Sequence, residues 1–270
     1  MTGYFKFRSW IVNVIKRNAG KKRMQKFYET LFHLSLIGMN YGNNGDLSET
    51  GEIYVLKKIR KNFGSDEQLT AFDAGANVGE YSKLIAKLFG ENTRIHSFEP
   101  SKKTYDRFVE NTSHIKNIIP NNFGLSDTEK NLLLYTNREN SGLASVYQRN
   151  LEHIGVEMNK SEEIKLSTII NYCKKNNINR IHLLKLDIEG HEFHALKGAV
   201  EMIENKKIDF IQFEFGGCNI DSRIFFQDFF YLLKDRYRIY RILKDGLAEM
   251  PEYSEKYELF IKSNFLAELK

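Results

Sequence analysis

The spacing of apolar side chains divides the chain into a helical first part and a remainder in which short apolar runs alternate with amphipathic stretches. In the first part, helical spacing is carried by Phe27, Leu31, Leu34 and Ile37. A polar turn over residues 40–46 interrupts this pattern, and residues 52–63 then place Ile53, Leu56 and Ile59 on one helical face. Residues 1–64 are therefore predicted to form a helical N-terminal extension.

From Leu69 onward the pattern predicts strands and helices in alternation. Strands are predicted over residues 69–73, 93–98, 115–123, 132–135, 181–186 and 210–215. Helices are predicted over residues 80–88, 102–111, 168–176 and 192–205, and within 223–234. Residues 137–160 are predicted to be a polar, mobile insertion, and residues 237–243 and 257–262 a closing antiparallel strand pair.

This alternation indicates an α/β domain, residues 65–270, with a mostly parallel sheet and helices on both faces. Ligands of such sheets bind at the carboxyl ends of the strands, where the strand order reverses. The composition fits one domain: of 270 residues 41% are hydrophobic and 28% are charged, and 3 prolines are too few for long linkers. Cys173 and Cys218 lack metal-ligand spacing and are interpreted as reduced thiols of a cytoplasmic protein.

The net charge of +5 is concentrated at the amino-terminal end, where residues 1–26 hold eight Lys or Arg and no Asp or Glu. No apolar run reaches the roughly 18 residues that span a bilayer, and a signal peptide would need a longer uninterrupted one. The favoured interpretation is a solvated helix packed against the domain. The second is a basic amphipathic helix in peripheral contact with the inner face of an acidic membrane. Nucleic-acid binding is not expected, because no recognition motif accompanies the charge.

The first predicted strand ends in a glycine-bearing turn, Phe72-Asp-Ala-Gly-Ala-Asn-Val-Gly-Glu-Tyr-Ser82. Gly75 permits a tight turn after the strand, and Gly79 permits the next helix to pack closely. Asp73 is poorly explained as a core residue, and its carboxylate suits an ammonium group or the loop amides. Many α/β proteins have such a turn, so by itself it is weak evidence for a nucleotide site.

A second strand end carries an acid. Phe98-Glu-Pro100 follows the glycines by about 20 residues, where a ribose-binding carboxylate is expected. Glu99 can accept hydrogen bonds from both ribose hydroxyls, and Pro100 stops the strand so that the carboxylate stays at its tip. A surface glutamate in a turn is the less favoured alternative. The ligand is interpreted as S-adenosylmethionine rather than a dinucleotide, because the three-glycine pyrophosphate fingerprint is missing.

A third group of polar residues follows the strand at 181–186, in Lys185-Leu-Asp-Ile-Glu-Gly-His-Glu192. An alcohol is a weak nucleophile, so methyl transfer to its oxygen calls for a nearby base. His191 titrates near neutral pH and is a candidate for that base. Asp187 is a candidate for orienting the methionine part of the cofactor or the acceptor hydroxyl. Glu192 has a structural explanation at a helix N-terminus.

Together these motifs resemble those of FkbM-type methyltransferases. Further matching pieces lie in order along the chain: Ser48-Glu-Thr-Gly-Glu52, Phe123-Gly-Leu-Ser-Asp127, Leu196-Lys-Gly198 and Gln212-Phe-Glu214. The resemblance covers about residues 45–216. It implies a Rossmann-like class I methyltransferase fold, with the two last predicted strands as its antiparallel pair, and S-adenosylmethionine as the methyl donor.

The resemblance also assigns residues by position. The implied cofactor-binding set is Glu52, Asp73, Gly75, Ala76, Asn77, Gly79, Tyr81, Ser82, Glu99, Pro100, Leu125, Ser126, Asp127 and Asp187. The set that would act in catalysis is Asp187, Glu189, His191 and Glu214, and the choice of base among them is open. The implied acceptor is a hydroxyl of a sugar, a glycan intermediate or a small secondary metabolite, contacted by residues 141–145 of the insertion.

A metal-bound site and two other functions are the alternatives to a metal-free O-methyltransferase. A divalent metal bridging Asp187 and Glu214 would suit their oxygen ligands, but a hydrogen-bonded carboxylate pair is favoured and no metal site is predicted. A nicotinamide-dependent oxidoreductase would use Glu99 on the ribose, but the sequence shows no proton relay for it. An inactive binding protein of glycan assembly would lack the carboxylates at the strand ends, whereas this chain keeps them. The sequence does not indicate an oligomeric state.

Overall fold

The computed structural model describes residues 10, 12–42, 47, 49–139 and 141–270, and the chain divides into two units, residues 1–42 and residues 43–270. The predicted basic segment over 1–26 and the predicted turn over 40–46 are therefore described only in part. Ser48 of the Ser48–Glu52 motif and position 140 of the insertion also lie outside the described residues.

The first unit consists of helical segments with almost no core. A short 3-10 helix, η1 (Lys22–Met24), leads into α2 (Gln25–Gly38), which confirms the helix predicted from apolar spacing. Among the described side chains of this unit, Leu36 alone is buried. In the described part of the whole chain, no helix combines the length and the apolar character needed to cross a membrane.

The boundary between the units lies after residue 42, earlier than the predicted boundary at residue 64. The reason is the packing of α3 (Glu52–Arg60), which belongs to the second unit. Its side chains Val55, Leu56 and Ile59 are fully buried in the same apolar cluster as residues of the first strand. The apolar face of this helix is thus part of the domain core rather than of an extension.

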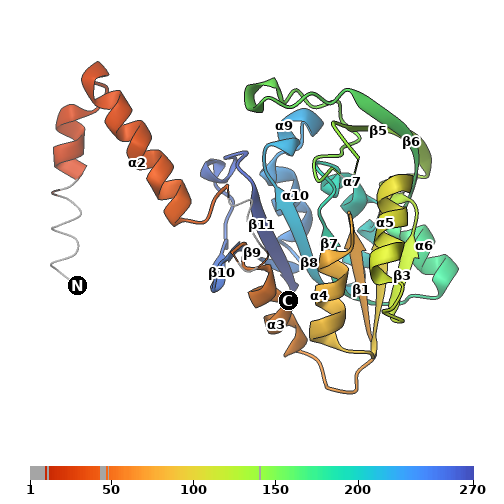
Figure 1. Cartoon of the computed structure of the whole chain (residues 1–270). Helices are drawn as coiled ribbons and strands as arrows, with labels where there is room; N and C mark the ends of the chain where they lie inside the picture. Colours follow the sequence, from red (N-terminus) through yellow and green to blue (C-terminus); the bar gives the residue numbers. More distant parts are fainter. Residues whose placement is uncertain (1–9, 11, 43–46, 48, 140) are drawn as a thin grey trace. The chain divides into compact units, whose positions relative to one another are not determined.

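The second unit is built on an eight-stranded sheet (Figure 1). Its strands are β1 (Leu69–Ala74), β2 (Thr93–Phe98), β3 (Ile118–Asn121), β7 (Ile181–Leu186), β8 (Ile208–Phe215), β9 (Tyr237–Leu243), β10 (Gly246–Glu249) and β11 (Ser263–Leu269). The order across the sheet is β10-β9-β11-β8-β7-β1-β2-β3. Pairing is parallel from β3 to β8 and antiparallel from β8 through β11 and β9 to β10. This order confirms the predicted Rossmann-like class I fold, and the strand order reverses between β1 and β7.

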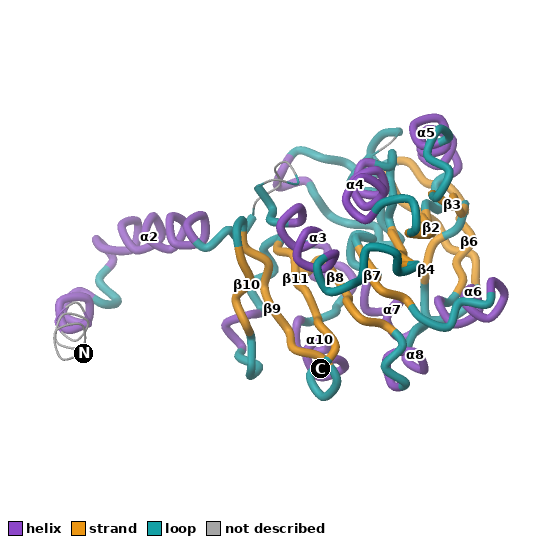
Figure 2. The backbone as a smooth tube through the Cα atoms, turned by 90° about the horizontal axis from the view of Figure 1, so that it is seen from below, coloured by secondary structure: helices purple, strands orange, loops and turns teal. Residues whose placement is uncertain are grey.

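Helices cover both faces of this sheet (Figure 2). One face carries α3, α4 (Glu80–Phe89) and α5 (Lys102–Thr112). The other carries α6 (Ile169–Asn176), α7 (Glu192–Lys197), α8 (Val200–Glu204) and α10 (Phe226–Leu233). Successive strand residues point to opposite faces of the sheet. In β1, Ala71 therefore belongs to the apolar cluster on the face of α3, α4 and α5, and Phe72 to the cluster on the other face.

A second sheet of three strands, in the order β4-β6-β5, lies beside the main one. Its strands are β4 (Gly124–Leu125), β5 (Lys130–Thr136) and β6 (Lys160–Ser167), and its apolar cluster is formed by Leu134, Ile164 and Leu166. The insertion between β5 and β6 carries η2 (Glu152–Ile154) and runs across the end of the main sheet toward α9 (Cys218–Ser222), as Figure 1 shows.

The structure corrects two predicted elements near the carboxyl end. The predicted strand over 257–262 is wrong: η3 (Glu255–Tyr257) occupies its start, and Phe260 has φ 47°, a left-handed backbone that turns the chain before β11 begins. The predicted helix over 192–205 is two helices, α7 and α8. They separate at Gly198, where a Cβ would lie 2.0 Å from the carbonyl oxygen of Ser126. Strands β4, β6 and β10 and helix α9 were not predicted.

Candidate functional site

A pocket lies at the carboxyl ends of β1, β2 and β7, beside the reversal of strand order. The pocket is lined by Gly75, Asn77, Phe98, Glu99, Pro100, Thr104, Gly124, Leu125, Leu134, Ser141, Gly142, Ala144, Val146, Ile164, Leu166, Asp187, Ile188, Glu189 and His191. The strand ends supply the polar groups, and the apolar face of the small sheet supplies the opposite wall.

The turn after β1 brings backbone and polar atoms to this pocket. Gly75 has φ 79°, and a Cβ there would lie 1.8 Å from the carbonyl oxygen of Asp187, so no other residue fits without moving the segment after β7. Asn77 is also left-handed, with φ 47°. Its side-chain Oδ1 is buried, and within the described part of the chain it has no hydrogen-bond partner. An unsatisfied buried acceptor is costly, which makes Asn77 Oδ1 a group that a ligand donor would satisfy.

Glu99 stands at the tip of β2, on the pocket wall. Its two carboxylate oxygens accept hydrogen bonds from the backbone amides of Asn77 and Ser101, each at 3.0 Å. The side chain is nearly enclosed, and this burial raises the pKa of the Glu99 carboxyl to about 7, although the two amide hydrogen bonds lower it. A carboxylate held in this way is rigidly placed and can accept further hydrogen bonds from hydroxyl groups in the pocket.

A series of buried polar side chains, each in contact with the next, lies next to the pocket. Thr50 and Gln212 donate to the two oxygens of Glu52, at 2.7 and 2.9 Å, and the Tyr81 hydroxyl donates to Gln212 at 2.6 Å. The Lys185 ammonium lies over the Tyr81 ring, 4.5 Å from its centroid. These groups connect α3, α4, β7 and β8 through the middle of the domain.

Lys185, the last side chain of this series, lies between two carboxylates. Its Nζ lies 3.3 Å from Asp187 Oδ2 and 3.6 Å from Asp73 Oδ1, and its side chain is 7% exposed. Burial lowers the pKa of the ammonium, but the neighbouring carboxylates of Asp187, Asp73 and Glu52 raise it by more, so Lys185 stays charged. Ser82 donates to the other Asp73 oxygen at 2.6 Å. The lysine therefore fixes the carboxylates at the ends of β1 and β7.

The segment after β7 presents Asp187 and Glu189 to the pocket. The Asp187 side chain is 32% exposed, into the pocket, and although burial raises its pKa, Lys185 and Lys262 lower it by more, so it remains ionised. Glu189 has φ 52°, a strained conformation for a residue with a side chain. The hydroxyl of Ser145 donates to the Glu189 carbonyl at 2.7 Å and links the insertion to this segment.

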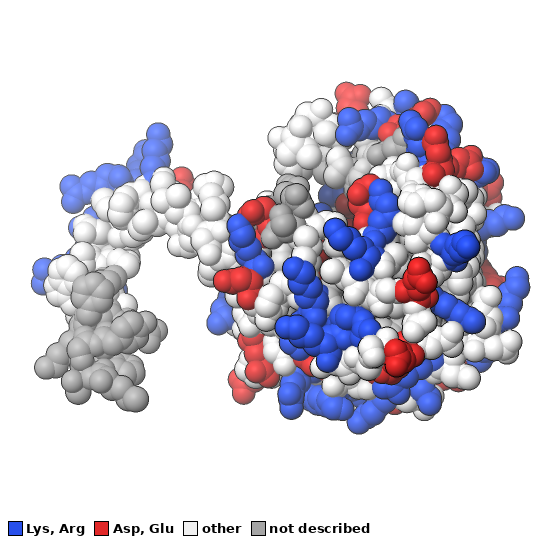
Figure 3. Space-filling model, turned by 60° about the horizontal axis from the view of Figure 1, so that its bottom comes forward, with Lys and Arg blue, Asp and Glu red and all other residues white. Residues whose placement is uncertain are grey.

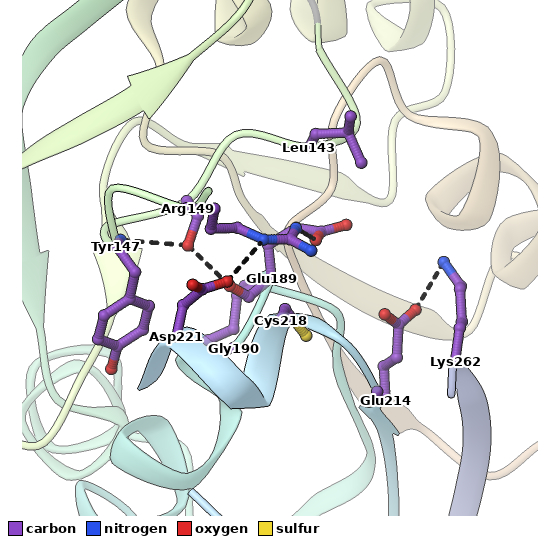
Figure 4. Close-up of polar contacts among 12 residues, drawn as sticks. Leu143, Tyr147, Arg149, Glu189, Gly190, Glu214, Cys218, Asp221 and Lys262 are labelled. Atoms are coloured by element: carbon purple, nitrogen blue, oxygen red, sulfur yellow. Dashed lines mark hydrogen bonds and ion pairs between the residues drawn. The ribbon is translucent and has the colours of Figure 1, made fainter. Parts of the chain in front are cut away.

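Beyond Glu189 lies what we call the charged cluster, formed by Arg149, Glu189, Glu214, Cys218 and Lys262 (Figure 4). An Arg149 nitrogen is 2.5 Å from Glu189 Oε2, and the Lys262 ammonium is 2.6 Å from Glu214 Oε2. Figure 4 shows these two ion pairs, which come from the insertion and the segment after β7 on one side, and from β8 and the segment before β11 on the other. The cluster adjoins the pocket because Glu189 belongs to both.

The two glutamates of the charged cluster hold protons more tightly than an ordinary carboxyl. Burial and the nearby carboxylates of Glu214 and Asp187 raise the pKa of Glu189, against a lowering by Arg149. Burial and Asp187 raise the pKa of Glu214 to about 7, against a lowering by Lys262. A carboxylate with a raised pKa is a stronger base than an ordinary one, which is the property a proton acceptor in catalysis requires.

His191 has surroundings of another kind. Its Nε2 lies 2.9 Å from the Ser126 hydroxyl and its Nδ1 lies 3.0 Å from the Tyr147 hydroxyl, so both ring nitrogens are engaged. Burial and the neighbouring His194, whose ring stacks on it, lower the pKa of His191 to about 3. The imidazole is therefore neutral and weakly basic. Of the candidates for the base, which the sequence leaves open, His191 is thus the one whose contacts suit a positioning role instead.

The structure brings together only part of the predicted site set. Of the predicted residues, the pocket is lined by Gly75, Asn77, Glu99, Pro100, Leu125, Asp187, Glu189 and His191. The predicted residues that are not part of its lining are Glu52, Asp73, Ala76, Gly79, Tyr81, Ser82, Ser126, Asp127 and Glu214. Asp127 accepts from Lys130 at 2.8 Å and from Ser126 at 2.9 Å. The Ser126 hydroxyl also lies 2.9 Å from Nε2 of the lining residue His191.

Several residues at the site were not predicted. A signal was available for Lys185, because a lysine inside the apolar run Ile181–Leu186 needs a carboxylate partner when the strand is buried. Arg149 and Lys262 gave no such signal, because Arg149 lies in the polar insertion, Lys262 ends a run that was predicted as a strand, and each meets its partner only through the fold. The apolar pocket wall formed by β5 and β6 was not predicted, because the sequence pattern of β6 does not indicate a strand.

Three potential metal ligands in the described residues, on Glu189, Glu214 and Cys218, lie within 4.8 Å of one another. Asp187, which was considered for a metal with Glu214, is not in this group. Arg149 and Lys262 already balance the two carboxylates at ion-pair distance. Burial and the nearby glutamates raise the pKa of the Cys218 thiol, which keeps it protonated. The donor set therefore fits two ion pairs better than a cation site.

Comparisons with known proteins point to one family. A family model described as the methyltransferase FkbM domain matches residues 73–239. The chain is similar to the hexuronic acid methyltransferase AglP of Haloferax volcanii, with 25% identity over 62% of this chain and 64% of that protein. It is also similar to Methyltransferase 1 of Beauveria bassiana, with 24% identity over 47% of this chain and 56% of that protein. The matches thus span less than two thirds of the length of either relative.

Among solved structures, the chain is similar to a methyltransferase FkbM from Methylobacillus flagellatus KT. The TM-score is 0.43 and the identity 15%, over 75% of this chain and 44% of that chain.

Proposed function

This chain belongs to the family of the methyltransferase FkbM domain, and on that premise we propose that it transfers a methyl group from S-adenosylmethionine to an oxygen atom of a sugar-type acceptor. The observation that carries the proposal is the pocket wall itself. There the glycine turn, the acid Glu99 and the carboxylates of Asp187 and Glu189 stand on adjacent strand ends.

The residues present fit the donor. Gly75 leaves a cradle that any Cβ would fill, and Asn77 Oδ1 is a buried acceptor in need of a donor. Glu99 would accept hydrogen bonds from the ribose hydroxyls, and the ionised Asp187 would favour the positively charged methionine end. Phe98 and Leu125, with the leucines of the small sheet, offer an apolar bed for the adenine ring. When bound, S-adenosylmethionine supplies an electrophilic methyl carbon on a sulfonium.

We propose Glu189 as the base. It lies at the junction of the pocket and the charged cluster, where an acceptor hydroxyl would have to approach. As the new carbon–oxygen bond forms and the carbon–sulfur bond breaks, the hydroxyl proton passes to the Glu189 carboxylate. Arg149 lowers the pKa of that carboxyl, but burial and Glu214 raise it by more, so Glu189 acts as the base at a pH high enough to ionise it.

A sugar acid is the acceptor class that the cations of the cluster favour. The Lys262 side chain is 35% exposed, whereas Arg149 is 8% exposed, so Lys262 is the accessible positive group next to the pocket. A carboxylate on the acceptor would pair with Lys262 while a hydroxyl faces Glu189. The similarity to a hexuronic acid methyltransferase supports this class.

The proposal is tested in two steps with the purified chain. Calorimetric titration with S-adenosylhomocysteine should show micromolar binding, and NAD⁺, the cofactor of the oxidoreductase alternative, should show none. Methyl-labelled donor is then incubated with neutral sugars, uronic acids and non-sugar alcohols. Label should enter the uronic acids most and resist alkali, since an ether is stable where a methyl ester is hydrolysed. Transfer to non-sugar alcohols alone would refute the acceptor class, and absence of S-adenosylhomocysteine binding would favour an inactive binding protein.

Replacing Glu99 with Gln is expected to weaken S-adenosylhomocysteine binding about tenfold to a hundredfold, because the charge-assisted hydrogen bonds to the ribose become neutral ones and the Gln side-chain NH2 group cannot accept from the backbone amide of Asn77 or Ser101 that it faces. The pKa of Glu99 is about 7 in the unliganded protein, so native affinity should fall by up to about tenfold per pH unit below that value. The variant should lose this pH dependence. Calorimetry between pH 5 and 8 measures both, and Glu162→Gln, a neighbouring acid outside this pocket lining, should change affinity less than about threefold.

A further inference from the structure

Helix α2 of the first unit carries apolar side chains that the described structure leaves exposed. Phe27, Phe32, Leu34 and Ile37 are 53%, 56%, 56% and 58% exposed. Phe27, Leu31 and Leu34 are spaced by three, four and seven residues and so share one face of the helix. Side chains of this size are rarely left in water as a group, and an exposed group of them marks a surface that contacts something else.

The charge of the same unit indicates what that contact is. Residues 10–42 hold six Lys or Arg, and Glu29 is the single acid among them. The basic residues are Lys16, Arg17, Lys21, Lys22, Arg23 and Lys26, all at or before the first turn of α2. Figure 3 shows Lys and Arg on this unit beside a surface over α2 that is mostly uncharged.

We propose that residues 12–42 form a docking surface for anionic lipid, with α2 lying in the plane of the membrane. An apolar face and adjoining basic residues are the two features by which a helix binds an interface: the first enters the boundary between headgroups and acyl chains, and the second attracts anionic headgroups. The length of α2, 14 residues, and the absence of a spanning helix in the described residues fit a helix that lies on the bilayer rather than crosses it.

Membrane docking would give the first unit a function and would also stabilise its helix. A 14-residue helix is marginally stable alone in water, and one buried side chain does not make a core. Burial of Phe27, Leu31 and Leu34 in lipid would supply the missing stabilisation. The catalytic domain would then work at a membrane surface, and its acceptor would be met there.

The test uses the full chain and sedimentation with vesicles. One set contains phosphatidylcholine alone, and the other contains equal parts of phosphatidylcholine and phosphatidylglycerol. The chain should bind the second set and not the first. A Lys21→Gln, Lys22→Gln, Arg23→Gln variant should bind about a hundredfold more weakly, because each basic residue near an anionic surface contributes about fivefold. A Leu31→Ser, Leu34→Ser variant should also lose binding while its affinity for S-adenosylhomocysteine is kept.

The matched control changes three exposed lysines of the second unit, Lys61→Gln, Lys87→Gln and Lys175→Gln, and should bind like the native chain. Three results would overturn the proposal. The first is equal binding to both vesicle types, or to neither. The second is a concentration-dependent dimer that the leucine variant dissolves, which would assign the face to a second copy of the chain. The third is a lower unfolding temperature of that variant without lipid, which would assign the face to the chain's own domain.

Discussion

Replacing Glu189 with Gln is expected to lower kcat about 10²- to 10⁴-fold, the usual contribution of a positioned general base. Glutamine has nearly the same shape and can still accept a hydrogen bond from Arg149, so the loss would report proton transfer rather than collapse of the site. Affinity for S-adenosylhomocysteine should change less than about threefold, because Glu189 touches the pocket at its edge toward the charged cluster. Rates from methyl-labelled donor and calorimetric affinities measure the two quantities.

The pH profile separates a base from a merely structural residue. Burial and the neighbouring carboxylates raise the pKa of Glu189, and a base must be deprotonated, so kcat should fall as pH falls through that raised value. The Gln variant should lack this limb. Asp221→Asn is the control, since it removes a different carboxylate, 3.4 Å from Arg149, and should cost less than about tenfold in kcat. A fully active Glu189→Gln enzyme would transfer the role to Asp187 or Glu214.

Replacing Lys185 with Met is expected to destabilise the domain by about 3–5 kcal/mol, the range for removing one partner of a buried ion pair. Methionine fills a similar volume but leaves the carboxylates of Asp73 and Asp187 without their cation. The free energy of unfolding from urea titration of native and variant chains measures the effect. The difference in free energy of unfolding between native and variant chains should shrink at low pH, because Lys185 lowers the pKa of Asp187 and Asp187 takes up a proton more readily without it.

A surface lysine provides the comparison. Lys58 pairs with Glu268 at 3.1 Å, but their side chains are 32% and 24% exposed, and Lys58→Met should cost less than about 1 kcal/mol. Equal stability losses in the two variants would mean that Lys185 is compensated by rearrangement or by water. The difference between the two stability losses tests whether the series of buried polar side chains depends on the charge of Lys185.

The sequence predicted four strands of the parallel sheet closely, and β1, β7 and β8 among them are largely apolar runs between turn-forming residues. The bounds of β2 and β7 agree with the prediction, and β1 and β8 differ by one or two residues. It failed where the apolar pattern was weak or misleading. Strand β6, Lys-Ser-Glu-Glu-Ile-Lys-Leu-Ser, is so rich in charge that its two inward residues, Ile164 and Leu166, were not recognised.

The prediction of the last strand was wrong for the opposite reason. Residues 257–262 have the aromatic and β-branched composition of a strand, yet there Phe260 packs on Phe215 and Phe225 at a turn. Strand β11 contains Asn, Ala and Glu, which are depleted in strands, and pairing with β8 and β9 overrides that preference. Tertiary contacts that no local pattern encodes decided both cases.

The sequence predicted the site residues at strand ends but not the cations that lie near them. Glu99 and Asp187 directly follow predicted strands, so a parallel sheet had to bring them together. The cations of the charged cluster could not be found in this way. Arg149 and Lys262 lie more than a hundred residues apart, in segments whose course depends on where the insertion and β11 pack.

The insertion over residues 137–159 has a further consequence, which follows from how its ends are held. Thr136 and Lys160 face each other as the last pair of the β5–β6 ladder, so the insertion leaves the domain and returns to it at one point. Lengthening such a loop costs little, because its closure entropy grows only slowly with its length. Replacing the segment with that of a relative should therefore leave the strand ends of β1, β2 and β7 in place, but it would rebuild the pocket wall formed by Ser141, Gly142, Ala144 and Val146 and is expected to redirect acceptor choice through that wall. Diversification of this lineage would be expected to concentrate in that one loop.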